Sequence, residues 1–288
     1  MPGNDEEVCV RNALVMMVLL WPLTALAEEP ETAPAESTAA VSAGEHEIMP
    51  AKRALVHVLV EMNLSADAAF KPFSIAPDLW YGVSDKLTVG LVHSFLAQTG
   101  IMGGFGSSLC LAGAANGCDG VYGNVGVDAR YQIKDGGFSV AVDTGLFVLD
   151  FDPFQLAGKL GIIGRWRPSP TSKLAVDIAP NMFFGFTGRD GGGVVGASAN
   201  GEVLTVPATL LYGINAKLAL ALQAGLVLPF DKAGDTYFIP VSVGADYLLS
   251  KRTSIDAAFT LLALAGGGAV DPKGADARTF TLGGGYAF

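Results

Sequence analysis

The stretch Val121-Tyr-Gly-Asn-Val-Gly-Val-Asp-Ala-Arg-Tyr-Gln-Ile133 decides the fold, because its residues alternate between two kinds. The apolar or small set comprises Val121, Gly123, Val125, Val127, Ala129, Tyr131 and Ile133. The set that carries the polar groups comprises Tyr122, Asn124, Gly126, Asp128, Arg130 and Gln132. Alternation with a period of two is typical of a β-strand, whose successive side chains point to opposite faces. One face of this strand suits lipid and the other suits water, as in a transmembrane barrel.

Similar alternation recurs from residue 53 onward. Twelve strands are predicted in all, an even number as single-chain bacterial barrels require. Besides 121–133, they occupy about 54–64, 72–83, 87–96, 138–149, 155–166, 173–186, 203–214, 218–229, 236–248, 253–263 and 278–288. Prolines inside these ranges remove ladder hydrogen bonds, so bulges or a miscounted pair keep a count of ten to fourteen open. These prolines are Pro77, Pro180, Pro207 and Pro240.

Composition supports an integral membrane protein without spanning helices. Half of the residues are apolar and 16% are charged, yet no window past residue 30 approaches the roughly 20 uninterrupted apolar residues of a membrane helix. Since lipid satisfies no backbone polar group, the remaining architecture is an all-β, closed antiparallel barrel. The net charge of −10 excludes nucleic acid as a partner, because phosphate binding needs a concentrated basic surface.

The N-terminal residues predict export. Residues 1–27 form a signal peptide, with an apolar core followed by Ala25-Leu26-Ala27, after which we expect cleavage. Residues 28–52 are rich in Ala, Glu, Pro and Thr, so we expect a disordered periplasmic linker. A segment that plugs the barrel or docks a partner is the alternative for this linker. The barrel then comprises residues 53–288.

The connections between strands alternate in length, which sets the direction of the barrel. Short connections belong in the periplasm and the long ones, 97–120, 187–202 and 264–277, belong outside. Each strand that descends to the periplasm carries an outward aromatic residue just before its end, as expected for a girdle at the lipid–water boundary. These residues are Tyr81, Tyr131, Trp166, Tyr212, Tyr247 and Tyr286.

Three segments that begin at Tyr81, Tyr212 and Tyr247 share one design of aromatic residue, polar turn, cation and restarting strand. They resemble the periplasmic hairpins of Gram-negative outer-membrane β-barrel proteins, a porin-like class. The terminal Arg278-Thr-Phe-Thr-Leu-Gly-Gly-Gly-Tyr-Ala-Phe288 resembles the last strand of that class, which ends in an aromatic residue. The resemblance implies residence in the outer membrane, contact with its lipid, and recognition of Phe288 by the barrel-assembly machinery.

Inward positions carry charges that we expect to line the pore. They are the acids Glu61, Asp78, Asp128, Asp143, Asp177, Asp246 and Asp256 and the bases Arg130, Lys159 and Arg165. The acidic excess predicts a small passive channel with weak cation selectivity. A solvated or salt-bridged wall that merely fills a narrow barrel is the alternative, as is a structural or surface-interaction barrel without conductance.

The sequence offers few residues that could form a catalytic site. His57 points inward and His93 falls on an outward position of the predicted strand. Glu61 shares the face of His57, but four residues of strand separate them by about 13 Å, which excludes direct pairing. An outer-membrane hydrolase is therefore the third candidate; we expect no catalytic residue and no cofactor.

Cys110 and Cys118 are the pair that remains after the leader. Export to an oxidising compartment predicts a disulfide between them. A metal site would need two further ligands, and Asp119 supplies at best one, so no metal is expected.

Overall fold

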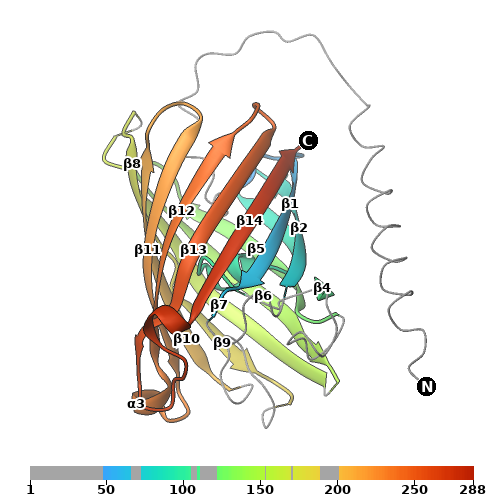
Figure 1. Ribbon diagram of the computed structural model, residues 1–288. Coiled ribbons are helices and arrows are strands. Elements are labelled where there is room, and N and C mark those ends of the chain that lie inside the picture. Colours follow the sequence, from blue (N-terminus) through green and yellow to red (C-terminus); the bar gives the residue numbers. More distant parts are fainter. Residues whose placement is uncertain are drawn as a thin grey trace, which may run out of the picture. The chain divides into compact units, whose positions relative to one another are not determined.

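The computed structural model describes residues 48–65, 73–104, 109–110, 122–152, 154–169, 171–188 and 201–288. The described residues form one antiparallel sheet that closes on itself (Figure 1). Its first seven strands are β1 (Ala54–Asn63), β2 (Phe73–Ser84), β3 (Leu87–Val92), β4 (Leu109–Cys110), β5 (Val125–Lys134), β6 (Phe138–Phe151) and β7 (Phe154–Trp166). The others are β8 (Leu174–Ile178), β9 (Asn181–Gly185), β10 (Val203–Gly213), β11 (Leu218–Pro229), β12 (Phe238–Leu248), β13 (Thr253–Gly266) and β14 (Arg278–Ala287).

Closure comes from β1, which pairs with β2 on one side and with β14 on the other. The fourteen strand segments make twelve complete strands of the wall. β8 and β9 are two halves of one strand, since each pairs with both β7 and β10. β4 is a two-residue piece attached to the start of β2. The predicted closed barrel of twelve strands is therefore confirmed.

Two of the four prolines interrupt the ladder as their chemistry requires. Pro180 lies in the break between β8 and β9, so the strand predicted over 173–186 is not continuous. Pro240 lies at an irregularity between Ile239 and Val241, where the register between β12 and β13 shifts. Pro77 and Pro207 remain inside regular pairings, opposite Val58 and Gly225.

The two largest errors in the predicted strand ends lie beside the longest loop. β3 ends at Val92 rather than at residue 96, because Ser94 caps a short helix, α2 (Phe95–Thr99). β5 begins at Val125 rather than at residue 121, because Asn124 has a left-handed φ of 58° that a strand does not accommodate. Val121 lies outside the described residues.

We call the end of the barrel where β1 begins and β14 ends the terminal end, and the opposite end the loop end (Figure 1). Short turns join the strands at the terminal end, such as the one between β2 and β3. The loop end carries α3 (Ala233–Thr236) and a single 3-10 turn, η5 (Gly274–Asp276). Most of the predicted loop 187–202 lies outside the described residues.

The outer face of the wall is apolar, with exposed aromatic residues near both ends of the barrel. All six aromatic residues predicted for the girdle are exposed near the terminal end, with Tyr131 52% exposed and Tyr286 38% exposed. The sequence analysis missed a second set of exposed aromatic residues at the loop end, which form an arc from β5 to β11: Tyr122, Phe151, Phe154, Phe184, Phe186 and Phe230. Exposed aliphatic side chains such as Leu146, Leu160, Leu222 and Val243 cover the wall between them. An apolar band with aromatic residues at both of its edges is the surface that a bilayer requires.

Within the described ranges, none of the helices combines the length and the apolar character needed to cross a bilayer.

Candidate functional site in the barrel lumen

The ten charged side chains predicted for the interior all lie on the inner face of the wall. Eight are buried, while Asp246 and Asp256 are half-buried. The alternation of each strand explains this, because their outward neighbours, such as Val127, Tyr131 and Tyr247, are exposed. The structure also shows which groups these ten charged side chains contact.

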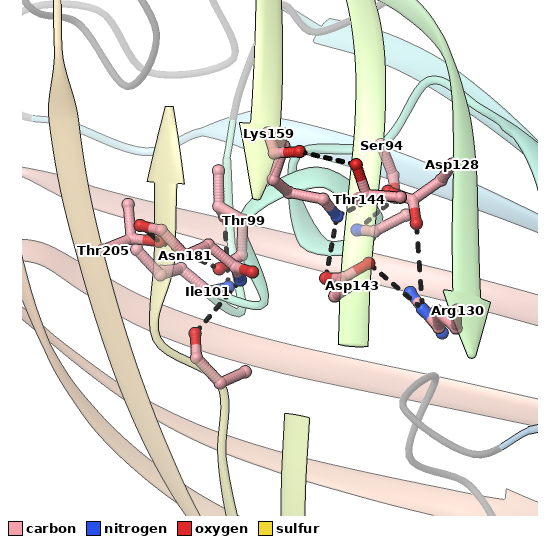
Figure 2. A network of polar contacts seen from close by, with 12 residues as sticks. Ser94, Thr99, Ile101, Asp128, Arg130, Asp143, Thr144, Lys159, Asn181 and Thr205 are labelled. Atoms are coloured by element: carbon pink, nitrogen blue, oxygen red, sulfur yellow. Dashed lines mark hydrogen bonds and ion pairs between the residues drawn. The ribbon is translucent and has the colours of Figure 1, made fainter. Parts of the chain in front are cut away.

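Four of the charges form one cluster on β5, β6 and β7 (Figure 2). The Lys159 ammonium contacts Asp128 Oδ2 and lies 2.9 Å from Asp143 Oδ2. Arg130 Nε lies 4.0 Å from Asp128 Oδ1 and 3.9 Å from Asp143 Oδ1. The Arg130 guanidinium also stacks 3.9 Å above the Trp80 ring. Two acids and two bases leave this cluster without net charge.

Arg165 and Asp177 form a second neutral set on the neighbouring strands β7 and β8. They lie directly opposite each other in the ladder. Arg165 Nε donates to Asp177 Oδ1 and Nη2 donates to Oδ2, each at 2.7 Å. This bidentate geometry is the strong form of the arginine–carboxylate pair.

Glu61 and Asp78 hold the chain that follows β3. Asp78 Oδ1 accepts hydrogen bonds from the backbone N–H groups of His93 at 2.6 Å and Ser94 at 3.0 Å. Glu61 Oε1 accepts one from the backbone N–H of Phe95 at 3.3 Å. The two carboxylates therefore bind the start of α2, whose first N–H groups have no partner within the helix.

Residues 93–104, which we call the lumen segment, cross the interior of the barrel. Gln223 on β11 binds this segment twice, accepting from the backbone N–H of Met102 at 2.7 Å and donating to the Gly100 carbonyl at 2.8 Å. The Met102 carbonyl accepts from Thr260 on β13 at 2.8 Å and from Ser242 on β12 at 3.2 Å. The anchor on β2 lies across the closed sheet from β11. The predicted loop 97–120 thus begins inside the barrel, not outside it.

Apolar side chains fill the space around the lumen segment. Ile101 and Ala97 are buried in one cluster with Phe147, Phe183 and Trp80. Gly90 lies beneath the Trp80 ring, where a β-carbon would overlap it. This part of the interior is packed as a protein core and narrows the lumen.

His93, which the sequence analysis placed on an outward position, is not exposed. It is buried, and its Nε2 lies 2.8 Å from the Tyr122 hydroxyl, while Nδ1 contacts the Pro77 carbonyl. The Tyr122 ring, which is exposed, lies beside the imidazole, with the two ring centroids 5.8 Å apart. Burial lowers the pKa of the His93 imidazole from its usual range, and the hydrogen bond to Pro77 opposes that shift.

A cavity of about 280 Å³ lies between the lumen segment and the terminal end. Met102 and Leu96 form its inner side, and Asp246 and Asp256 lie on its wall. His57 lines it too, with Nε2 at 2.7 Å from Asp256 Oδ1. The carboxylate partner of His57 is therefore Asp256 on β13.

Residues 48–52, which the prediction assigned to the disordered linker, are ordered at the rim of this cavity. The Met49 N–H donates to Thr88 Oγ1 at 2.8 Å, and the Ala51 N–H donates to Asp85 Oδ1 at 3.1 Å. The end of the predicted linker, residues 48–52, is therefore part of the ordered structure.

One of the two cysteines of the predicted disulfide lies outside the described residues. Cys110 is in β4, at the loop end, whereas Cys118 lies outside the described residues. The disulfide stays a prediction.

A closed barrel of twelve antiparallel strands, apolar outside and polar inside, has the architecture of a transmembrane β-barrel. No family model matches the chain, and no curated protein matches it significantly. Solved structures do resemble its fold. A NanC porin matches with a TM-score of 0.55 and 10% identity over 80% of this chain and 98% of that one. An outer membrane channel from Pseudomonas putida F1 matches with a TM-score of 0.53 and 13% identity over 90% and 100% of the two chains. A KdgM porin in complex with disordered oligogalacturonate matches with a TM-score of 0.51 and 12% identity over 81% and 99%.

Proposed function

We propose that this protein is a small passive channel of a Gram-negative outer membrane. The observation that carries the proposal is the closed wall, with an apolar band edged by aromatic residues outside and ionic side chains inside. The short turns and both barrel termini then face the periplasm, and the loop end faces outward. The structural neighbours named as porins and channels support the same assignment.

The pairing of the lumen charges determines which of them can influence ions. The four-residue cluster and the Arg165–Asp177 pair are neutral as units. Glu61 and Asp78 bind the start of the lumen segment. Asp246 and Asp256 line the cavity, where Asp256 contacts His57, and these two carboxylates are half-buried whereas the other predicted lumen charges are buried. We assign the weak cation selectivity to Asp246 and Asp256 because of this greater exposure.

An acidic wall disfavours anionic solutes. The KdgM structure contains an oligogalacturonate, whereas the lumen described here has an excess of acids over bases. We infer that neutral or cationic small solutes pass more readily than anionic sugars. Screening over about 8 Å at physiological salt keeps this preference modest.

Conductance of the refolded full chain in a planar bilayer tests the proposal. Reversal potentials under a salt gradient should show a cation preference that fades as salt rises. Asp246→Asn combined with Asp256→Asn should reduce the preference. Asp135→Asn, in the exposed turn between β5 and β6, is the matched control and should leave it unchanged. An anion preference in the unmodified protein would exclude these acids as the filter.

A structural barrel without conductance is the second candidate function. The lumen segment favours it, because hydrogen bonds tie that segment to β2 and to β10 through β13. Bilayers that contain folded barrel but show no current steps would establish this second candidate and refute the first.

A further inference from the structure

We propose that the opening of the barrel at its terminal end, the terminal mouth, binds small soluble anions that carry several negative charges, such as inorganic triphosphate. The site is a set of five exposed cations, which we call the cationic ring: Arg53, Lys86, Lys173, Lys217 and Arg252. Binding is independent of conduction, and only its effect on current rests on the proposed function.

The members of the cationic ring occupy equivalent positions in the chain. Each stands directly before a strand that runs from the terminal end to the loop end, namely β1, β3, β8, β11 or β13. The sixth strand of this direction is β6, and Gly137 precedes it. The Gly137 carbonyl accepts a hydrogen bond from the N–H of another cation, Arg167, at 2.7 Å. Positive charge therefore recurs around the whole terminal mouth.

The sheet fixes the backbone of the cationic ring. The carbonyl group of each member accepts a hydrogen bond of 2.8 or 2.9 Å from an N–H group of the neighbouring strand. The donors, from Arg53 to Arg252, are Gly82, Gln132, Gly213, Leu248 and Ala287. Ring members with one strand between them, such as Lys217 and Arg252, therefore have Cα atoms about 10 Å apart, because neighbouring strands are separated by roughly 4.8 Å.

Alternation directs the side chains of the cationic ring toward the aqueous mouth. Two residues after each member, on the same face of its strand, stand Leu55, Thr88, Ala175, Ala219 and Ser254. Three of these, Thr88, Ala175 and Ala219, are buried, and the other two line the cavity. The aromatic girdle occupies the opposite, outer face. A solute in the mouth is therefore the better partner of the ring than a lipid headgroup outside it.

Few acids stand beside the cationic ring. Among the described residues of the turns at the terminal end, the exposed acids are Asp85 and Asp135, and both accept hydrogen bonds from backbone N–H groups. The C-terminal residue Phe288 accepts from Arg53 Nη1 at 3.4 Å. The terminal mouth therefore carries an excess of positive charge, which raises the local concentration of anions.

The lumen behind the cationic ring has the opposite sign. Asp256 follows Arg252 by four residues of strand, which span about 13 Å, and Asp246 lies directly opposite Asp256 in the ladder. These two carboxylates repel an anion that moves deeper into the cavity. An anion that the ring attracts is therefore held at the mouth and does not pass through the lumen.

The spacing of the cationic ring favours anions with several charges. Neighbouring members lie about 10 Å apart, which exceeds the screening length of about 8 Å at physiological salt. A monovalent anion at one cation therefore gains little from the next. A chain of phosphate groups can contact two long side chains, such as those of Lys217 and Arg252, at once. Rings of Lys and Arg serve the same purpose in anion-selective pores.

Charged thiol reagents measure the potential at the cationic ring. Ala216→Cys, made in the full chain with Cys9→Ser, Cys110→Ser and Cys118→Ser, places an exposed thiol beside Lys217. We expect a negatively charged methanethiosulfonate to react faster than a positively charged one, relative to a free thiol, by roughly five- to tenfold at low salt. Because both reagents attack the same thiolate, the ratio of the two rates cancels the reactivity of the thiol itself.

The loop end supplies the position control. Gly234→Cys, in the same background, places a thiol where an added β-carbon meets no other atom within 4 Å. The exposed acids Asp231 and Asp235 lie beside it in the sequence. We expect the positively charged reagent to react faster at this position.

Paired substitutions assign the reagent preference of Ala216→Cys to the cationic ring. Lys217→Gln with Arg252→Gln should remove most of it, whereas Lys217→Arg with Arg252→Lys keeps the charge and should retain it. Lys232→Gln with Lys273→Gln removes two cations at the loop end and should change nothing. A preference that persists in the first pair would exclude the ring as its cause and overturn the proposal.

Protection from a neutral maleimide tests binding itself. Inorganic triphosphate should slow the reaction of Ala216→Cys in phosphatidylcholine vesicles, and potassium chloride at the same ionic strength should not. Lys217→Gln with Arg252→Gln should abolish this protection. An equal effect of potassium chloride would leave only charge screening and overturn the site. Protection that requires phosphatidylglycerol in the vesicles would assign the ring to a lipid headgroup and overturn it as well.

Equal reagent preferences at Ala216→Cys and Gly234→Cys, or no protection by triphosphate, would also overturn the proposal. In a conducting barrel, triphosphate on the terminal side should reduce the cation current. Protection without any conductance would refute the channel alone, and cation-selective conductance without protection would refute the anion site alone.

Discussion

His57 Nε2 lies 2.7 Å from Asp256 Oδ1, although β1 and β13 are separated by β14. The contact passes over the inner face of β14, where Gly283 and Gly285 stand opposite these residues. A β-carbon at Gly283 would overlap the Asp256 carboxylate. The absence of a side chain at this position is what allows two second-neighbour strands to interact.

Gly283→Ala should therefore destabilise the barrel by about 1–3 kcal/mol, the usual cost of overpacking. The measurement is the temperature at which the folded, fast-migrating form is lost on a denaturing gel. Gly284→Ala is the control, because Gly284 faces outward and a β-carbon there would lie 3.9 Å from the Ser254 carbonyl oxygen. Equal shifts in the two variants would remove the His57–Asp256 contact as the cause.

Lys159→Met should destabilise the barrel by about 3–5 kcal/mol, because it leaves the buried Asp128 and Asp143 carboxylates without their nearest cation. Urea unfolding in detergent measures the change. Addition of Asp143→Asn should recover part of the loss, whereas Lys173→Met, at an exposed position, should cost little. An unchanged midpoint in Lys159→Met would show that water satisfies the cluster.

Gln223→Ala removes both hydrogen bonds from β11 to the lumen segment. Unsatisfied buried groups cost about 1–3 kcal/mol, which shifts the equilibrium between bound and released segment roughly 5- to 150-fold. We expect larger and more frequently fluctuating bilayer currents. Gln132→Ala, at the terminal end of β5, is the matched control. Identical current records would contradict a restrictive role for the segment.

Acidification should loosen the lumen segment through His93. Its lowered pKa means that the released state binds a proton more readily than the docked state. Docking is therefore fully stable above the usual histidine pKa of about 6.5 and weakens as pH falls below that value. The groups that face His93 are the Tyr122 hydroxyl, the Pro77 carbonyl and, at its backbone, Asp78. Conductance should rise between neutral and mildly acidic pH, and His93→Gln should abolish that rise.

Deletion of Phe288 should impair insertion more than the stability of a finished barrel. The Phe288 N–H donates to the Ala54 carbonyl at 2.9 Å, and its ring packs 4.8 Å from Tyr286. One hydrogen bond at the seam contributes about 1 kcal/mol, too little to unfold the barrel. We expect the variant to accumulate in the periplasm yet refold normally in detergent. Normal outer-membrane yield would argue against recognition of this residue by the assembly machinery.

The alternation of side chains specified the wall of this barrel because period two depends only on neighbouring residues. It placed Asp128 and Lys159 on the inner face, but it could not show that they meet, since β5 and β7 are brought together by the sheet. For the same reason, the sequence could not predict that Asp128, Arg130, Asp143 and Lys159 form one cluster without net charge. Pro180 marked the break between β8 and β9, although nothing local distinguished it from Pro207, which the ladder accommodates.

The lumen segment was missed for a different reason. A long connection has no periodicity that relates it to the wall, so its inward path depends on distant partners such as Gln223. One local signal was present: Ser94 and Gly100 flank Phe95–Thr99 as an N-cap and a left-handed C-cap. Those caps predict a helix where alternation predicted the end of a strand.

The bonds of Met102 also constrain the order of events during folding. Its carbonyl accepts from Thr260, which lies 158 positions later in the chain, and its N–H binds a side chain 121 positions later. Contacts between such distant residues form slowly, since their loop-closure entropy must be overcome first. The strands through β13 must therefore form before the lumen segment can make these hydrogen bonds. Binding of the segment to the wall is then a late kinetic phase of folding, separate from formation of the wall.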